Sequence, residues 1–226
     1  MAAIIIPAYN EVLRIGAVLR AVTRSKYARE VIVVNDASED ATAEIARRIP
    51  GVRVLEHRVN VGKGGALATG VAACNADLIA FVDADLEGLR PEHVDMILEP
   101  LLDGRCDMCI GVFRGGKFWS DSAQRVAPLI SGQRAMRREF FEGVPGISDM
   151  RMGVEVALNT HAKRCKARIV RVCLPGVSHP SKEQKLGLVK GAAARARMYA
   201  DIGRTVVKLR APRKRTVRKR KDFTGL

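Results

Sequence analysis

The chain has 226 residues, of which 47% are hydrophobic and 28% charged, and its formal net charge is +15. This composition supports one sizeable core and favours one domain over two. No apolar run approaches the roughly 20 residues that span a bilayer, and the N-terminal "MAAIIIPAYNE" lacks the basic start and the length of a signal peptide. We therefore expect a cytoplasmic protein.

Apolar runs alternate with helical patterns along the first half of the chain. Buried strands are predicted at 2–8, 30–36, 52–57, 77–83 and 106–113. Helical spacing and helix-start residues predict helices at 11–24, from 38 onward, and at 64–75 and 91–102. Strands that alternate with helices imply right-handed crossovers, so we expect an α/β fold with a mainly parallel central sheet and helices on both faces.

The second half of the chain is less regular. Frequent turn residues over 115–150 predict loops and short helices, and a helix at 152–161 and a strand at 167–174 are expected to follow. We expect three parts in the whole chain. These are a folded domain over 1–180, a basic amphipathic helix over 181–211, and a flexible polybasic tail over 212–226.

The five cysteines form no regular framework, which is typical of a protein in a reducing compartment. Cys106 and Cys109 make a C-x-x-C string, but residues three apart on a strand point to opposite faces. No second pair completes a zinc site. Both are therefore predicted to be buried structural thiols.

Polar side chains follow three of the predicted strands, and ligands of parallel α/β sheets bind beyond the carboxyl ends of the strands. Asp83 and Asp85 follow a buried run and are separated by one residue. Two negative charges at such a short distance repel one another unless a cation or solvent offsets the repulsion. Both can reach a single Mg²⁺ or Mn²⁺, which would stabilise a diphosphate leaving group. Since D-x-D is also a common loop string, the interpretation depends on the motifs around it.

Four motifs occur in order, each at or just after a predicted strand end: "IIIPAYNE", "VIVVNDASEDAT", "NVGKGGALATG" and "FVDADLEG". This set resembles the family 2 glycosyltransferases, enzymes with the GT-A nucleotide-diphosphosugar fold. The resemblance covers about residues 3–115 and continues more weakly to about residue 190. It implies a Rossmann-like GT-A domain that transfers a hexose from a UDP- or GDP-sugar with inversion, using Mg²⁺ or Mn²⁺.

The resemblance also implies roles for residues at the strand ends. Asp36 would recognise the base, and Asp83, Ala84 and Asp85 would form the motif for the ribose and the metal-bound diphosphate, with Asp85 the stronger metal candidate. Asn35 and Ala37 depart from the acid and the glycine that the family usually has there. The expected donor-binding set is Pro7, Ala8, Tyr9, Glu11, Val34, Asp36, Lys63, Asp83, Ala84, Asp85 and Arg114. For Lys63, a structural turn in the glycine string is an equal alternative.

The later motifs resemble the polyprenyl-phosphate sugar synthases, the dolichol-phosphate mannose synthase group. "GVFRGG" places Arg114 where that group has a donor-binding arginine. In "SHPSKEQKLG", Lys185 matches the group's lysine, and His179 stands where its arginine would be. Because a histidine binds phosphate or a metal, His179 joins both the expected acceptor set and, with Asp83 and Asp85, the metal set.

The segment "ISGQRAMRREFF" lies where these enzymes form the acceptor side. The expected acceptor-binding residues are Gln133, Arg134, His179 and Lys185. The alternative for the arginines of this segment is a solvated basic helix face. A lipid phosphate is already ionised, whereas a sugar hydroxyl needs a general base. The expected catalytic set is Asp85, Asp149 and Glu155, the last two being the candidates for a base or for a plain ion pair with an arginine.

The stretch 204–221 holds ten Lys or Arg and no acid. Such a segment suits an anionic membrane surface, so we expect a peripheral protein on the inner face of the membrane and prefer a polyprenyl phosphate as acceptor. One alternative is a transferase that uses a soluble or cell-envelope sugar hydroxyl. Another is a non-specific nucleic-acid-binding protein, which would leave the acidic motifs unexplained. The oligomeric state stays open, with a homo-oligomer among the options.

Overall fold

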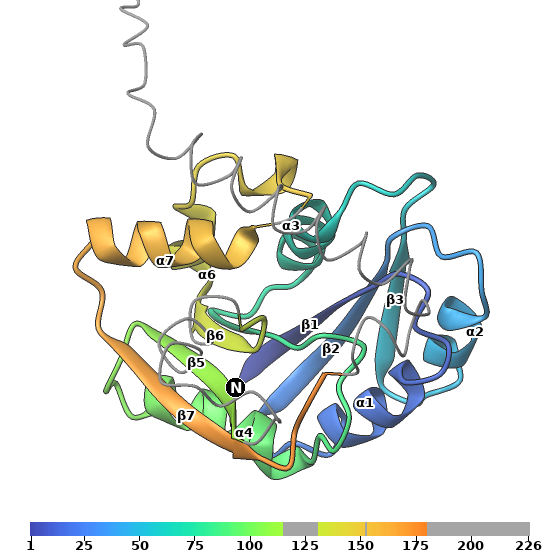
Figure 1. The fold of residues 1–226 in the computed structure, drawn as a ribbon, viewed down its shortest axis with the longest axis horizontal. Helices are drawn as coiled ribbons and strands as arrows, with labels where there is room; N and C mark the ends of the chain where they lie inside the picture. The colour runs from blue at the N-terminus through green and yellow to red at the C-terminus, as the bar shows by residue number, and fades with distance from the viewer. Residues whose placement is uncertain (115–130, 152, 180–226) are drawn as a thin grey trace, which may run out of the picture.

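The computed structural model describes residues 1–114, 131–151 and 153–179 (Figure 1). These residues form a seven-stranded sheet with the order β3-β2-β1-β4-β6-β5-β7. Neighbouring strands are parallel except at β6, which is antiparallel to both β4 and β5. The strands are β1 (Ala2–Ala8), β2 (Ala28–Asn35), β3 (Val52–Glu56), β4 (Leu78–Phe81), β5 (Met108–Arg114), β6 (Arg134–Arg137) and β7 (Ile169–Pro175). The predicted α/β fold with a mainly parallel sheet is confirmed.

Helices cover both faces of the sheet (Figure 1). Because successive strand residues point to opposite faces, Ile4 and Ile6 of β1 pack with α1, α2 and α4, whereas Ile5 packs with α3, α6 and α7. The central strands are therefore buried on both sides, as their continuous apolar runs predicted. The helices are α1 (Ile15–Val22), α2 (Thr42–Arg47), α3 (Lys63–Ala73), α4 (Pro91–Leu102), α6 (Arg138–Glu142) and α7 (Val154–Arg164), with a 3₁₀ helix η1 (Ile147–Asp149).

Strand β6 corrects the prediction of loops and short helices over 115–150. Its sequence "RAMR" consists of residues with high helix propensity and contains no β-branched side chain. It is a strand because β4 and β5 pair with it on either side. The alternative interpretation, a solvated basic helix face, is thus wrong for Arg134, which is fully buried. Arg137 is exposed, and Arg138 begins α6 and forms an ion pair with Glu142.

The other predicted elements agree with the structure to within a few residues at their ends. Cys106 and Cys109 are buried free thiols, as expected. The predicted helix over 181–211, the polybasic tail over 212–226 and Lys185 lie outside the described residues.

A buried histidine fixes the start of α4. Pro91 occupies the first turn, and His93 Nδ1 accepts a hydrogen bond of 3.1 Å from the backbone N–H of Arg90. His93 is 1% exposed. Burial, followed by the charge of Arg90, lowers its pKa below the usual range of histidine. Over a range of pH just below the usual pKa of histidine, the imidazole is therefore neutral in the folded chain and protonated in the unfolded chain.

We expect acidification to destabilise the fold through His93. As pH falls below about 6.5, the unfolded chain takes up the proton first, so the free energy of unfolding decreases by at most about 1.4 kcal/mol per pH unit for this group. His93→Gln keeps an acceptor at the third helical position, where glutamine commonly serves as a cap, and does not titrate. Urea denaturation of both proteins between pH 7 and 5 should show a smaller loss for the variant. If the free energy of unfolding fell equally with pH in both proteins, the destabilisation would not come from His93.

Candidate active site

Two loops at the carboxyl edge of the sheet are tied to one another. The backbone N–H groups of Asn10 and Glu11, after β1, donate to Ser38 Oγ at 3.0 Å and Thr42 Oγ1 at 2.8 Å, after β2. Ala37 adopts a left-handed φ of 60°, a conformation that a glycine takes at less cost. The alanine that departs from the family pattern therefore occupies the conformation expected at that turn. Since β1 lies between β2 and β4 and is parallel to both, these loops and the segment after β4 leave the sheet at the same edge.

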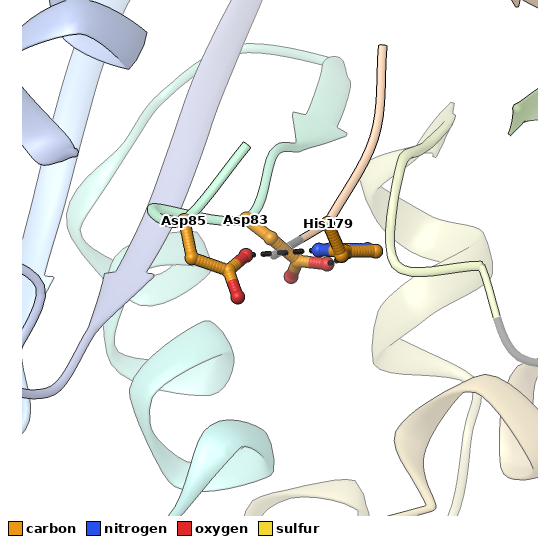
Figure 2. A group of neighbouring side chains, drawn as sticks. All are labelled: Asp83, Asp85 and His179. Carbon is orange, nitrogen blue, oxygen red and sulfur yellow. Dashed lines mark hydrogen bonds and ion pairs between the residues drawn. The ribbon is translucent and has the colours of Figure 1, made fainter. Parts of the chain in front are cut away.

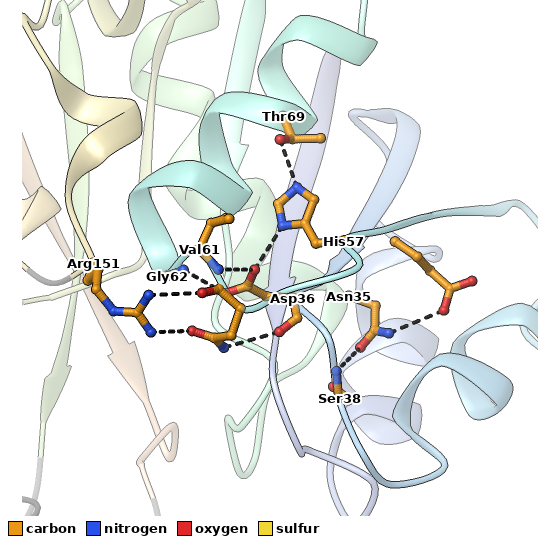
Figure 3. Close-up of polar contacts among 10 residues, drawn as sticks. Asn35, Asp36, Ser38, His57, Val61, Gly62, Thr69 and Arg151 are labelled. Carbon is orange, nitrogen blue, oxygen red and sulfur yellow. Dashed lines mark hydrogen bonds and ion pairs between the residues drawn. The ribbon is translucent and has the colours of Figure 1, made fainter.

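Asp36 joins the end of β2 to the start of α3 (Figure 3). Its side chain is 5% exposed. Its carboxylate accepts the backbone N–H groups of Val61 at 2.9 Å and Gly62 at 2.8 Å, and Nδ1 of His57 lies 2.8 Å from its Oδ1. Asp36 thus has a positioning function within the chain, and its predicted contact with a base stays a prediction.

The sequence shows no partner pattern for His57 and indicates no role for it. The structure places its ring between Asp36 and Thr69 of α3, whose Oγ1 lies 2.9 Å from Nε2 (Figure 3). The signal that could have found it is its position at the end of a predicted strand, beside the acidic end of β2. Its partner Thr69 lies on a helix 12 residues further on, which sequence spacing alone does not connect.

The glycine string is a packing surface for η1 and the residues after it. The N–H of Lys63 donates to the carbonyl of Arg151 at 3.1 Å, and that of Gly64 to Met150 at 2.8 Å. A Cβ on Gly64 would lie 2.2 Å from the carbonyl oxygen of Ile147. Since Asp36 takes the two preceding amides, four successive N–H groups at the start of α3 are satisfied within the chain. The string therefore acts as a structural turn and does not present these amides to a phosphate.

The side chain of Lys63 lies between two carboxylates. Its Nζ is 2.7 Å from Asp83 Oδ1 and 2.6 Å from Glu155 Oε1. Burial alone would lower the pKa of Lys63, but these two charges outweigh it and raise the pKa well above the usual range. Burial would likewise raise the pKa of Asp83, but the charges of Lys63 and His179 hold it below its usual range. The lysine is a permanent cation that keeps Asp83 ionised.

Asp83, Asp85 and His179 form a group that can hold a metal ion (Figure 2). One ligand atom from each lies within 4.8 Å of the others. His179 Nδ1 is 3.0 Å from Asp85 Oδ1, and Nε2 is 3.7 Å from Asp83 Oδ2. Burial lowers the pKa of His179, but the hydrogen bond to Asp85 and the two carboxylate charges raise it above the usual value. Two carboxylates and one imidazole fit a divalent cation such as Mn²⁺, whereas Mg²⁺ takes oxygen ligands.

Two of the predicted acceptor residues lie inside the fold. Gln133 is fully buried and donates from Nε2 to Asp83 Oδ2 at 2.8 Å. Arg134 is also fully buried and donates to the Ser131 carbonyl at 2.7 Å and to Asn159 Oδ1 at 2.6 Å. Burial lowers the pKa of Arg134 to about 10. Gln133 therefore belongs to the surroundings of the metal group, a function that the sequence did not indicate.

The remaining predicted donor residues fall at or just after the expected strand ends, whereas the two predicted bases lie on η1 and α7. Tyr9 is 45% exposed, whereas Val34 and Ala84 are buried. Asp149 is exposed on η1, where Ser148 Oγ donates to it at 3.3 Å, so of the two predicted bases only Glu155 contacts the Lys63 and Asp83 pair. Pro7 and Ala8 are the last residues of β1, and Glu11 lies in the loop that follows it. Arg114 is the last residue of β5, and its side chain is not among the described ones.

A family model described as "Glycosyl transferase family 2" matches residues 3–169. The chain belongs to glycosyltransferase family 2. This confirms the family that the four motifs indicated, and the neighbours among solved structures confirm the GT-A fold.

Curated relatives of this glycosyltransferase match part of its length. An uncharacterized protein of Methanocaldococcus jannaschii is 37% identical over 111 residues, which are 48% of this chain and 44% of that protein. The dolichyl-phosphate beta-glucosyltransferase ALG5C of Trichomonas vaginalis is 40% identical over 94 residues, which are 36% of this chain and 28% of that protein. The chain thus matches less than half the length of these relatives.

A solved structure extends the likeness over most of the chain. Glucosyl-3-phosphoglycerate synthase from Mycobacterium tuberculosis, in complex with Mn²⁺, UDP and glucosyl-3-phosphoglycerate, superposes with a TM-score of 0.68 at 26% identity. The match covers 90% of this chain and 80% of that protein. Within the described part of our chain, no helix has the length and apolarity to cross a membrane.

We expect Lys63→Met to destabilise the protein strongly. The side chains of Asp83 and Glu155 are only 17% and 15% exposed, and removing their shared cation takes the lysine charge from both, leaving Asp83, among the described residues, with Gln133 and His179 alone. Breaking a buried pair in this way costs about 3 kcal/mol or more of the free energy of unfolding. Urea denaturation without metal measures the loss.

The matched control is Lys26→Met, because Lys26 pairs with Glu99 at 3.1 Å on the surface, where both partners are largely exposed. This variant should unfold at nearly the same urea concentration as the wild type. Similar small losses in both variants would show that Lys63 does not neutralise the site.

Proposed function

We propose that this family 2 glycosyltransferase transfers a hexose from a UDP- or GDP-sugar, with inversion at the anomeric carbon, to an acceptor that carries a phosphate. The preferred acceptor is a polyprenyl phosphate at the inner face of the membrane. The observation that carries the proposal is the cluster of Asp83, Asp85 and His179 at the carboxyl edge of the sheet, with one ligand atom of each within 4.8 Å of the others.

Asp83, Asp85 and His179 would hold the divalent cation. When bound there, a cation such as Mn²⁺ would offset charge on the diphosphate and stabilise it as a leaving group. Lys63 and Gln133 keep the Asp83 carboxylate in place from two sides, at 2.7 Å and 2.8 Å. A UDP donor is supported by the solved relative, which was crystallised with Mn²⁺ and UDP. The loops after β1 and β2 would form the wall against which the nucleoside binds.

The transfer itself needs few groups from the protein when the acceptor is a phosphate. An ionised phosphate oxygen forms the new bond to the anomeric carbon, and the bond from that carbon to the diphosphate breaks, with its electron pair leaving on the nucleoside diphosphate. No proton has to be removed from the acceptor. Glu155, which is already paired with Lys63 at 2.6 Å, then has an electrostatic role rather than that of a base.

The acceptor class rests on weaker similarities than the donor. A relative over 94 residues is named as a dolichyl-phosphate glucosyltransferase, and the ten basic residues of 204–221 suit an anionic membrane surface. The second candidate is a soluble phosphorylated acceptor that reacts through a hydroxyl. It is favoured by the solved relative, whose structure holds glucosyl-3-phosphoglycerate. In that case Glu155 or Asp149 would have to accept the hydroxyl proton.

The first experiment is calorimetric titration of UDP and GDP into the wild type and Asp85→Asn, each with and without Mn²⁺. We expect one nucleotide to bind the wild type in a Mn²⁺-dependent manner, and the variant to bind at least about tenfold more weakly because an amide is a poorer metal ligand than a carboxylate. Asp103→Asn is the control, since Asp103 pairs with Arg105 on the surface. The absence of Mn²⁺-dependent binding in the wild type would overturn the proposal.

The acceptor is tested by transfer of labelled hexose to undecaprenyl phosphate in anionic vesicles or to 3-phosphoglycerate in solution. We expect the labelled hexose to appear on undecaprenyl phosphate. Glu155→Gln should retain a substantial part of the wild-type transfer rate because this acceptor requires no base. A product on phosphoglycerate only, lost in Glu155→Gln or in Asp149→Asn, would establish the second candidate instead.

A further inference from the structure

The third ligand of the metal group comes from a distant part of the sheet. Asp83 and Asp85 follow β4, whereas His179 follows β7, 94 residues after Asp85. Strands β6 and β5 lie between β4 and β7. At about 4.8 Å per strand, the axes of β4 and β7 are roughly 14 Å apart, so the chain after β7 has to return across this distance to reach Asp85.

A pair of backbone hydrogen bonds brings the two segments together. The N–H of Glu87 donates to the carbonyl of Ser178 at 3.0 Å, and the N–H of Ser178 donates to the carbonyl of Glu87 at 3.1 Å. This isolated antiparallel bridge lies two residues after Asp85 and one residue before His179. The ring of His179 also contacts Phe113 of β5 edge to face, at 5.1 Å between ring centres.

The bridge depends on a glycine. Gly88 has a φ of +73°, and a Cβ at this position would lie 2.1 Å from the carbonyl oxygen of Gly176. That atom is backbone, so a side chain at 88 forces the segment 176–178 away. Gly176 itself has a φ of +75° but open space around it, so only its backbone conformation requires glycine.

We propose that Gly88 and the bridge between Glu87 and Ser178 are a positioning device that delivers His179 to Asp83 and Asp85, and that this device determines the affinity of the site for its metal. The inference rests on the proposed metal-dependent function and adds residues that do not touch the metal. Loss of such supporting contacts around metal ligands typically lowers metal affinity about 10- to 100-fold.

The test is Mn²⁺ binding, measured by calorimetry and by electron paramagnetic resonance of free Mn²⁺, in the wild type and in Gly88→Ala. We expect the affinity to decrease at least about tenfold. Gly104→Ala is the matched control, because Gly104 also has a positive φ, +68°, but nothing lies within 4 Å of its would-be Cβ. Both substitutions place an alanine at a positive φ, and only Gly88→Ala should change Mn²⁺ affinity.

A second pair of variants shows whether the effect passes through His179. In a His179→Ala background, Gly88→Ala should cause no further loss of Mn²⁺ affinity. Ser178→Pro removes one of the two bridge donors and should weaken binding as Gly88→Ala does, which keeps the test decisive if Gly88→Ala does not fold. Equal affinity in wild type, Gly88→Ala and Ser178→Pro would overturn the positioning device while leaving the metal site intact. A wild type that binds no Mn²⁺ would instead overturn the proposed function.

Discussion

The ion pairs of Lys63 are the interaction on which the rest of the site depends. Three negative charges lie near one another at one edge of the sheet, those of Asp83, Asp85 and Glu155. Carboxylates at such short distances repel one another unless a cation lies among them. Lys63 supplies it from the first residue of α3, and thereby joins the segment after β4 to the start of α7. The paired aspartates are thus compatible with a folded, metal-free chain, and His179 adds a second partial compensation beside Asp85.

The position of Lys63 is determined in turn by backbone contacts that only glycines allow. Gly64 lets the carbonyls of Ile147 and Met150 approach α3 closely, and Asp36 holds the preceding amides. A cation whose side chain must meet two carboxylates within 3 Å needs a helix start that does not move, and this packing provides it. The glycine string therefore serves the site through the geometry of α3 rather than through contact with a ligand.

The fold, and the edge of the sheet at which the candidate site lies, could be predicted from the sequence because both follow from local patterns. Continuous apolar runs define β1, β2 and β4, and the residues that end them face the same edge of a parallel sheet. Strand β6 was missed because "RAMR" has helix-forming residues and becomes a strand through pairing with distant neighbours. The contact of Gln133 with Asp83 and the place of His57 beside Asp36 were not predicted for a related reason. A buried amide or imidazole acquires its function from a partner on another element, and no spacing along the chain records that partner.

The sequence left open whether His179 binds a phosphate or a metal ion, and the geometry of its surroundings favours the metal ion. Its ring lies between two carboxylates, at 3.0 Å from Asp85 and 3.7 Å from Asp83, and a position surrounded by negative charge favours a cation over a phosphate. Arg134 is engaged inside the fold by Ser131 and Asn159. Of the cationic residues predicted for the acceptor, those in the described ranges are thus directed to internal partners. Lys185, the other cation that the motif predicts for the acceptor, lies outside the described residues, and its contact with an acceptor stays a prediction.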